Sequence, residues 1–326
     1  MITVTATEAP GAGSMPTMGA QYNQLAVVQP DATSDRADPL PLGELLGLVE
    51  ASGDSAFTGM PHMGRPPRAF GGVTLAQALL AAGRTVDGGR QPHSLHAYFL
   101  RSVAPEASVA YEVERLRDGA SYAARQVAAR QDGMTVLSLS ASFKKPESAL
   151  DHQPEMPAAP APDDCEAPYE AMAREHPERY AESVIPRAVD LRLVEADADE
   201  LAARADGMSR RRCWLRAARP LPDEPLLHAA ALAYLSDLTI SPTAALPWEP
   251  HGARSSRRSR VMLASLDHAM WFHRPTRADA WLLYAQHTTN LSDGRAMSRG
   301  ELWSQEGQLV ASVVQEALIR HRPAVT

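Results

Sequence analysis

The chain has 326 residues, which is enough for one large domain or two of moderate size. Its composition is 44% hydrophobic and 22% charged, with a formal net charge of −7, so a general attraction for nucleic acid or anionic lipid is excluded. No apolar run approaches the roughly 18 residues of a membrane span, and the first residues lack the basic and apolar parts of a secretory signal. The two cysteines form no metal or disulfide pattern, and we expect a cytoplasmic protein.

In chain order, residues 1–38 are polar and rich in Thr, Pro, Gly and Ala, which is typical of a flexible tail. Residues 39–146 are predicted to form a first domain, with an alanine-rich apolar helix over 72–84 followed by strands rich in β-branched and aromatic residues. A proline-rich linker is predicted over 147–184. Residues 185–322 repeat the order, with an apolar helix over 226–239 and a second run of strands.

The two blocks match one another at a nearly constant spacing. Residues 99–101 match 272–274, and the Asp-Gly pairs at 118–119 and 293–294 match as turns. Both helices are too apolar to lie on a surface, so each should be enclosed by its sheet. The sequence therefore predicts an α+β fold of two tandem domains, each an antiparallel sheet wrapped around a central apolar helix, the arrangement called a double hotdog.

The duplication also serves as a filter for function, because residues that serve only the fold should occur in both copies. Asp237 lies near the end of the second apolar helix, where the first copy has Leu80, and a buried carboxylate is costly unless it is bonded or functional. Gln315 lies in the last strand, where the first copy has Ala141. Ser265 lies just before a signature strand of the second copy.

Together these three side chains suit the hydrolysis of a thioester. A carboxylate such as Asp237 can orient a water molecule and accept its proton, while Gln315 and the Ser265 hydroxyl can hold the same water. The glycines Gly71 and Gly72 form a tight entry into the first helix and could present backbone N–H groups to a ligand.

Several rival sites are weaker. The basic run that contains Arg257 and Arg258 is either a solvated loop or a contact for the phosphates of a nucleotide-bearing substrate. A dyad of Asp267 and His268 would suit general base catalysis, but neighbouring residues on a strand point to opposite faces. The chain has no Gly-x-Ser-x-Gly nucleophile motif and no histidine pattern of a zinc site, so no metal or other cofactor is expected.

At this point the sequence resembles the acyl-CoA thioesterase II family, the TesB-type enzymes, over about residues 40–147 and 185–321. The residues that carry the resemblance are Phe70-Gly71-Gly72, 93–101 (HSLHAYFLR), 116–125 (LRDGASYAAR), 234–238 (YLSDL), 266–275 (LDHAMWFHRP) and 309–316 (LVASVVQE). The resemblance implies a double hotdog that hydrolyses acyl-CoA without a metal. It also implies that Asp237, Ser265 and Gln315 position the water, and that the chain forms a homodimer or a higher homo-oligomer.

Two positions depart from the family pattern. Ser265 stands where a threonine is usual, which keeps the hydroxyl with a less restrained rotamer, and Val73 replaces a glutamine after the two glycines. The leading hypothesis is a thioesterase for medium- to long-chain acyl-CoA. A catalytically silent acyl-CoA-binding or scaffold protein and a hotdog hydratase remain as alternatives. The hydratase would need an aspartate and a histidine close together on a hotdog helix.

Overall fold

The computed structural model describes residues 38–51, 53–64, 67–205, 207–248 and 261–321. Its helices are α1 (Leu42–Leu45), α2 (Gly71–Arg84), α3 (Pro168–Glu175), α4 (Pro177–Glu182), α5 (Val184–Ala188), α6 (Ala198–Ala205), α7 (Pro225–Ser236) and α8 (Ile240–Thr243), with short 3₁₀ turns at Pro162–Asp164 and Leu246–Trp248. Among these described residues, no helix combines the length and the apolar character that crossing a membrane requires.

All described strands belong to one antiparallel sheet. The strands before the proline-rich segment are β1 (Leu48–Glu50), β2 (Ala56–Gly59), β3 (Gln91–Phe99), β4 (Val109–Asp118), β5 (Tyr122–Gln131) and β6 (Met134–Lys144). Those after it are β7 (Val189–Leu193), β8 (Arg210–Ala217), β9 (Val261–Ser265), β10 (Asp267–Phe272), β11 (Leu282–Ser292), β12 (Arg295–Ser304) and β13 (Leu309–His321). The order is β1-β2-β4-β5-β6-β3-β10-β13-β12-β11-β8-β7, with β9 paired to β13 outside this path.

The two halves of the sheet join through β3 and β10. These strands pair antiparallel, with His96 opposite Ala269 and Leu95 opposite Met270. β3 and β10 are equivalent strands of the two copies. Each also pairs with the last strand of its own copy: β3 with β6, and β10 with β13. The predicted duplication is therefore visible as one continuous sheet with equivalent strands at its centre.

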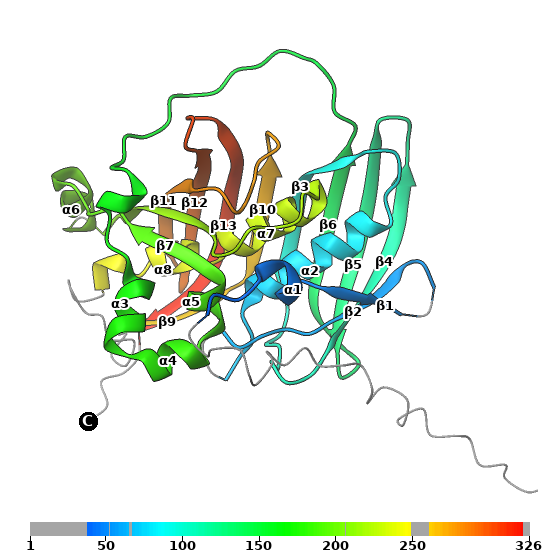
Figure 1. Ribbon diagram of the computed structural model, residues 1–326, viewed down its shortest axis with the longest axis horizontal. Helices are drawn as coiled ribbons and strands as arrows, with labels where there is room; N and C mark the ends of the chain where they lie inside the picture. Colours follow the sequence, from blue (N-terminus) through cyan, green and yellow to red (C-terminus); the bar gives the residue numbers. More distant parts are fainter. Residues whose placement is uncertain (1–37, 52, 65–66, 206, 249–260, 322–326) are drawn as a thin grey trace, which may run out of the picture. The chain divides into compact units, whose positions relative to one another are not determined.

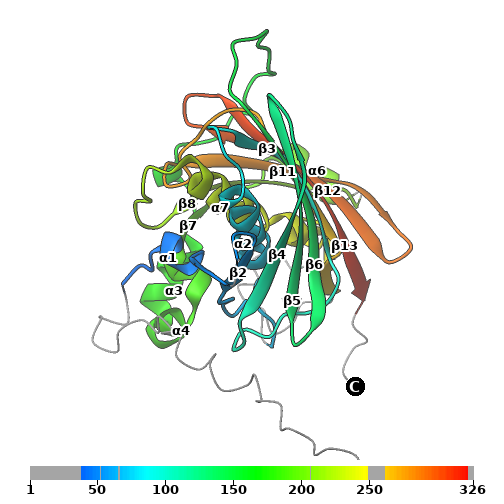
Figure 2. The same ribbon diagram turned by 90° about the vertical axis from the view of Figure 1, so that its right-hand side faces the viewer.

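The two long helices pack against one another on one side of the strands (Figures 1 and 2). They run antiparallel, because Gly72 near the start of α2 lies against the Tyr234 carbonyl oxygen, whereas Gly83 near the end of α2 lies against Leu226 at the start of α7. Twelve of the α2 residues are buried, as the predicted enclosure requires. Small residues allow this close approach: a methyl group on Gly72 would meet the Tyr234 oxygen at 2.9 Å.

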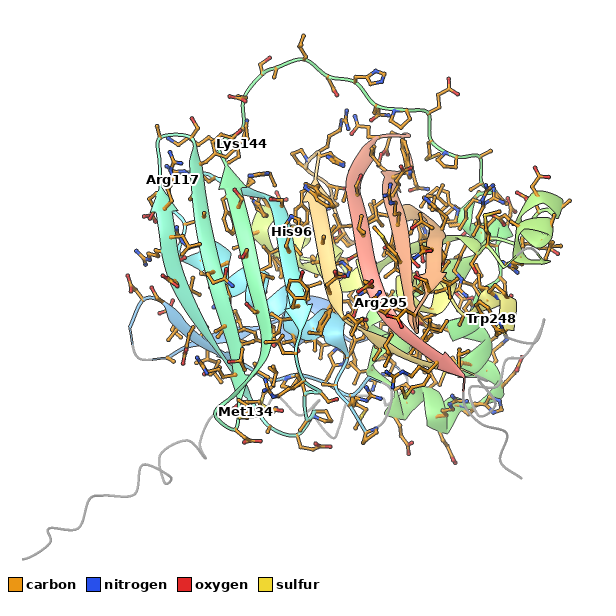
Figure 3. All side chains as sticks on the ribbon, turned by 180° about the vertical axis from the view of Figure 1, so that it is seen from behind. His96, Arg117, Met134, Lys144, Trp248 and Arg295 are labelled. Atoms are coloured by element: carbon orange, nitrogen blue, oxygen red, sulfur yellow. The ribbon has the colours of Figure 1, made fainter. Side chains whose placement is uncertain are left out.

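The other face of the sheet is turned towards the viewer in Figure 3. His96 lies near the middle of this face, with its ring edge-on to Trp271 at a centroid distance of 5.1 Å. The tight turns use left-handed backbone where aspartate precedes glycine: Asp132 and Asp293 have φ of 50° and 48°. These turns close the hairpins β5–β6 and β11–β12.

One boundary differs from the sequence prediction in a way that matters for the candidate site. The second apolar helix was expected to continue to residue 239, but α7 ends at Ser236 and a separate short helix, α8, begins at Ile240. Pro242 explains the break, because its ring would clash with the carbonyl oxygen of Leu238 in a continuous helix. Asp237 therefore lies in the break between two helices, and its side chain points towards the start of α2.

Candidate functional site

Asp237 is the residue that caps the C-terminal end of α7, and its side chain is buried against the start of α2. The Gly72 backbone N–H donates a hydrogen bond to the carboxylate. Gly71 lies beside the other side of the group: a methyl group there would come within 3.1 Å of Oδ2. The first turn of a helix presents unpaired N–H groups and a partial positive charge, so α2 favours a negative group at this place.

Gln315 links this carboxylate to the sheet. It projects from β13 and is 1% exposed. Its amide nitrogen donates to Asp237 Oδ1 at 2.7 Å, and its amide oxygen accepts from the Ser241 hydroxyl at 2.6 Å. Ser241 belongs to α8, the short helix created by the break after Asp237.

Ser265 is linked to the same network through Ser241. It ends β9 and is half-buried, and it pairs with Ala317 of β13. Its Oγ lies 3.2 Å from Ser241 Oγ. The structure thus brings Asp237, Gln315 and Ser265 into one cluster, with Ser241 as the bridge between Ser265 and the amide. The sequence prediction had no role for Ser241.

His268 also belongs to the cluster, although the sequence analysis had treated it as part of a weaker rival site. As expected, Asp267 and His268 point to opposite faces: Asp267 Oδ1 accepts the Glu316 backbone N–H at 2.6 Å, away from the cluster. His268, however, is fully buried inside the cluster, with Nδ1 3.1 Å from the Gln315 amide nitrogen and 3.9 Å from Asp237 Oδ1. Its Nε2 lies 2.9 Å from the Ser236 hydroxyl.

Burial controls the charges of this cluster. Removal from water raises the pKa of Asp237 to about 7, although the hydrogen bonds from Gln315 and Gly72 act in the opposite direction. The same burial lowers the pKa of His268 to about 3, so the imidazole is neutral at physiological pH. A carboxylate that exchanges its proton near neutral pH is suited to act as a base in water.

The remaining predicted site residues divide into two groups. Gly71 and Gly72 open α2 and lie directly against Asp237. Arg257 and Arg258 fall outside the described residues. Within the described part of the chain, no group of three or more histidine, cysteine, aspartate or glutamate side chains is placed to hold a metal ion.

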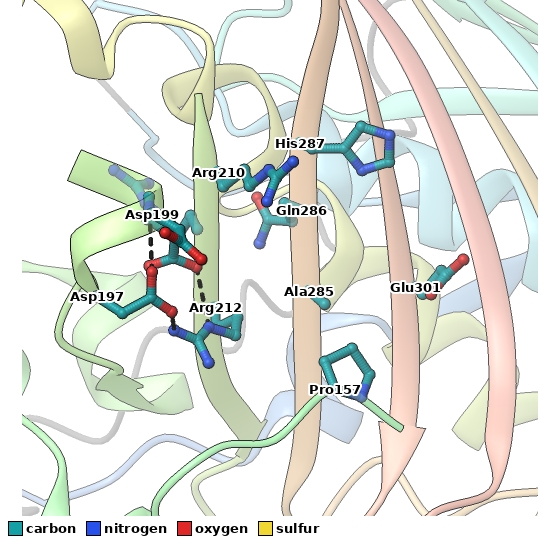
Figure 4. Close-up of a pocket in the computed structure, with 11 residues that line it drawn as sticks. Pro157, Asp197, Asp199, Arg210, Arg212, Ala285, Gln286, His287 and Glu301 are labelled. Atoms are coloured by element: carbon teal, nitrogen blue, oxygen red, sulfur yellow. Dashed lines mark hydrogen bonds and ion pairs between the residues drawn. The ribbon is translucent and has the colours of Figure 1, made fainter. Parts of the chain in front are cut away.

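A polar cleft of about 420 Å³ lies at the far end of the sheet, over β8, β11 and β12 (Figure 4). Arg212 in this cleft is compensated by acids from α6 and the preceding turn: it is 2.7 Å from Asp197 Oδ2 and 2.9 Å from Glu200 Oε1. These bonds tie Arg212 of β8 to α6 and to the turn before it.

Comparison with known proteins places these features in a family. The model of the acyl-CoA thioesterase N-terminal domain matches residues 60–144, and that of the C-terminal domain matches residues 162–319. Acyl-coenzyme A thioesterase 8 from Homo sapiens is 32% identical over 311 residues, covering 90% of this chain and 94% of the relative.

Solved structures agree with this match. The crystal structure of the acyl-CoA thioesterase II TesB2 from Mycobacterium marinum aligns with a TM-score of 0.68 and 36% identity, over 87% of this chain and 98% of that one. A protein with a hot dog fold from Alicyclobacillus acidocaldarius, 22% identical, aligns with a TM-score of 0.66 over 85% and 97% of the two chains, which supports the fold alone. The predicted double hotdog is confirmed, and the chain belongs to the acyl-CoA thioesterase family.

Proposed function

We propose that the protein hydrolyses medium- to long-chain acyl-CoA to a free fatty acid and CoA, with Asp237 as the general base. The observation that carries this proposal is the buried carboxylate of Asp237, bonded by Gln315 and by the first turn of α2. Its pKa of about 7 makes it a good proton acceptor of which about half is ionised at neutral pH.

The proposed reaction uses a water molecule held between Asp237 and Ser265. Asp237 takes a proton as the water oxygen bonds to the thioester carbonyl carbon. The negative charge that forms on the carbonyl oxygen is stabilised by the start of α2, where we assign the Gly71 backbone N–H as a donor. The intermediate then collapses, the C–S bond breaks, and Asp237 returns the proton to the departing CoA sulfur.

An apolar region next to the cluster supports an acyl chain as the substrate. Gln315 and Ser265 share a sheet face with residues farther along the same strands, and α8 covers that face. The buried cluster there consists of Ala244, Ala245, Val261, Ala296 and Ile319, with Trp248, Leu263 and Leu291 packed around it. An open cleft of about 310 Å³, lined on its other side by the turn at 292–295, lies beside these side chains. Burial of each CH₂ group of a fatty acyl chain in such a region contributes about 0.8 kcal/mol.

One observation favours the hydratase alternative, and another argues against it. Asp237 and His268 do lie 3.9 Å apart, although they come from a helix end and a strand and not from one helix. Both ring nitrogens of His268 are engaged, one by Gln315 and one by Ser236. The histidine therefore has no free nitrogen to exchange a proton with a substrate, and hydrolysis is the better supported reaction.

The test is CoA release from acyl-CoA substrates of 4 to 16 carbons, for the wild type and for Asp237→Ala. We expect turnover to fall by 10²-fold or more in the variant. Asp54→Ala, which removes an exposed carboxylate far along the chain, is the control and should behave as wild type. Binding of acyl-CoA without CoA release by the wild type would support the silent binding protein, and wild-type turnover in Asp237→Ala would exclude Asp237 as the base.

The acyl chain length is tested by enlarging the space beside the apolar region. Ile319→Ala enlarges the cleft lined by Trp248, Val261 and Leu291 without touching the polar cluster. We expect the preferred chain length to increase and short substrates to lose affinity, because fewer of their carbons reach apolar contacts. An unchanged chain-length profile would mean that the acyl chain binds elsewhere.

A further inference from the structure

The hydrogen bonds of the cluster have a single consistent direction. A carboxylate only accepts, so the Gln315 group that faces Asp237 is its NH₂, and the second hydrogen of this NH₂ points to His268 Nδ1. Nδ1 must then accept, which places the imidazole proton on Nε2. That proton is donated to Ser236 Oγ, and the Ser236 hydroxyl donates in turn to the Ala233 carbonyl oxygen at 2.8 Å.

The other side of Gln315 continues the same direction. Its amide oxygen accepts the hydroxyl hydrogen of Ser241. Because Ser241 has given its only hydrogen to Gln315, the Ser265 hydroxyl must donate to Ser241 Oγ. Ser265 is left with lone pairs, so it is suited to accept a hydrogen from a water molecule. Both amide hydrogens of Gln315 are already used, so Gln315 acts on the carboxylate and does not donate to the water.

We propose that His268 is a positioning residue for the hydrolysis: its neutral imidazole accepts one amide hydrogen of Gln315 and thereby holds the other on Asp237. This inference rests on the proposed function of Asp237. Without the acceptor at Nδ1, the amide could rotate by 180° and turn its oxygen towards the carboxylate. The hydrogen bond to Asp237 would then be replaced by a repulsive contact between two acceptors.

The surroundings of His268 hold it in the required tautomer. The Ser236 hydroxyl is committed to Ala233 in the preceding turn of α7, so it can only accept from Nε2. The ring is fully buried, and the charged form would place a hydrogen on Nδ1 against the Gln315 NH₂. The same strand position in the first copy, 173 residues earlier, is Leu95, and it faces Ala141 where His268 faces Gln315. The polar pair is thus present only in the copy that carries Asp237.

Three substitutions separate this role from simple packing. In His268→Asn the side-chain oxygen occupies the place of Nδ1 and keeps the acceptor. His268→Gln places its amide nearer the position of Nε2 and loses that acceptor, and His268→Leu keeps an apolar volume like that of Leu95. We expect kcat to fall about 10- to 100-fold in the Leu and Gln variants with KM changed less than threefold, and His268→Asn to recover most of kcat.

The dependence of kcat on pH distinguishes the two roles, because a loss of packing alone would not shift it. The titratable groups around Asp237 are His268, Tyr234 and Tyr284. Loss of the Gln315 bond removes an interaction that favours the ionised carboxylate, so the acidic limb of the kcat profile should move to higher pH in the Leu and Gln variants and return in His268→Asn. A Leu variant with wild-type kcat and an unshifted limb would overturn the proposal. Equal losses in the Asn and Leu variants at unchanged melting temperature would overturn it too.

A measurement without substrate separates this inference from the function on which it rests. The Asp237 carboxyl can be titrated by ¹³C NMR in aspartate-labelled protein, with Asp237→Asn identifying its signal. The proposal expects the titration midpoint to rise in His268→Leu relative to the wild type, whether or not the protein hydrolyses acyl-CoA. Absence of hydrolysis in the wild type would refute the proposed function, whereas an unmoved midpoint would refute the role of His268.

Discussion

At the scale of single residues, the buried cluster contains a carboxylate that the fold itself does not require. Asp237 ionises in a buried position, where burial raises its pKa to about 7 against the hydrogen bonds that favour its charge. An ordinary surface aspartate would be a much weaker base. The strain of burying this carboxylate and its proposed role as a base are therefore two consequences of one environment.

The stability of the protein should reflect this strain. The folded pKa of Asp237, about 7, lies above that of an unfolded aspartate, about 3.9. The favourable contribution of the protonated group is complete below about pH 4 and is lost as the pH rises through about 7. Asp237→Asn cannot ionise, so at pH 8 we expect it to raise the free energy of unfolding by up to about 4 kcal/mol while turnover is lost.

Urea denaturation at pH 4 and pH 8 checks this prediction. The difference in unfolding free energy between Asp237→Asn and the wild type should be large at pH 8 and close to zero at pH 4. Asp54→Asn is the matched control, because its carboxylate is exposed and should show no such difference. A variant that is less stable than the wild type at pH 8 would contradict the assignment of a strained carboxylate.

The rate should follow the same ionisation. Only the ionised form of Asp237 can accept a proton from water, so kcat/KM should be half-maximal near pH 7 and fall about tenfold per pH unit below it. The measurement is kcat/KM for one acyl-CoA between pH 5 and pH 9, within the range in which the protein stays folded. A rate that is constant down to pH 5 would rule out a base with a raised pKa.

The sequence pointed to Asp237 and Gln315, which the structure joins by a hydrogen bond, because each differs in polarity from its presumed counterpart in the other copy. The same comparison, at the spacing that aligns 99–101 with 272–274, pairs His268 with Leu95 and would have found the histidine. Ser241 could not be found in this way. Its place in the cluster depends on the break after α7, which turns a chain expected to be helical back towards the sheet.

At the scale of elements, the contact between α2 and α7 explains why only one copy holds the site. Where the two helices meet at the Asp237 end, Gly71 and Gly72 leave room for the carboxylate. At the opposite end, Gly83 is covered by Leu226, whose methyl carbon Cδ1 lies 2.4 Å from where a Cβ would be. The helix contact thus makes Gly83 the counterpart of Asp237 in space, whereas alignment of the sequences had suggested Leu80. An apolar side chain fills the second position.

Alanine at these two glycines should have different effects. The methyl group of Gly72→Ala would meet a backbone carbonyl oxygen at 2.9 Å and the Phe70 ring at 2.4 Å, which forces the end of α7 and Asp237 to move. Gly83→Ala would meet only the flexible end of Leu226. We expect Gly72→Ala to lower kcat by 10-fold or more, because small displacements of reacting groups are costly. Gly83→Ala should keep kcat within about twofold.

Melting temperature and kcat are measured for both variants to separate folding from activity. Each substitution gains up to about 1 kcal/mol of helix propensity, so the difference between them isolates the steric contact. Equal kcat values for the two variants would mean that the position of Asp237 does not depend on the start of α2.

Several elements were beyond sequence reasoning for physical reasons. Strands β1, β2 and β7 have only three to five residues, too few for an alternating pattern to stand out. Strand β8 begins with three arginines, and charge of this kind normally indicates a solvated loop or an edge. Its arginines are accommodated by pairing with α6 and the turn before it, which no local pattern predicts. The runs of strands that were predicted after each apolar helix are observed as β3–β6 and β9–β13.

At the scale of the whole molecule, the two copies depend on each other for both folding and function. The strands β3 and β10 pair across the centre of the sheet, so neither copy alone would satisfy the backbone groups of that strand. The helices α2 and α7 cover one another. The site itself draws Asp237, Gln315 and His268 from the second copy and the start of α2 from the first.

Separating the copies should therefore abolish activity, and bringing them together again should restore it. We expect residues 149–322 alone to aggregate or to lack cooperative unfolding, because α7 and the edge of β10 become exposed. Co-expression with residues 39–148 should give a complex with thioesterase activity, since the two copies bury extensive apolar surface against one another. The control is the full chain, folded first and then cut at a protease site inserted after Ser148. This site precedes the segment in which Gln153 is bonded to Gly307 and Leu309. After cleavage this protein should elute as one species and keep its rate, because contacts and not the linker hold the copies together. A stable, active C-terminal half would show instead that the first copy contributes nothing to the site, and would remove Gly71 and Gly72 from it.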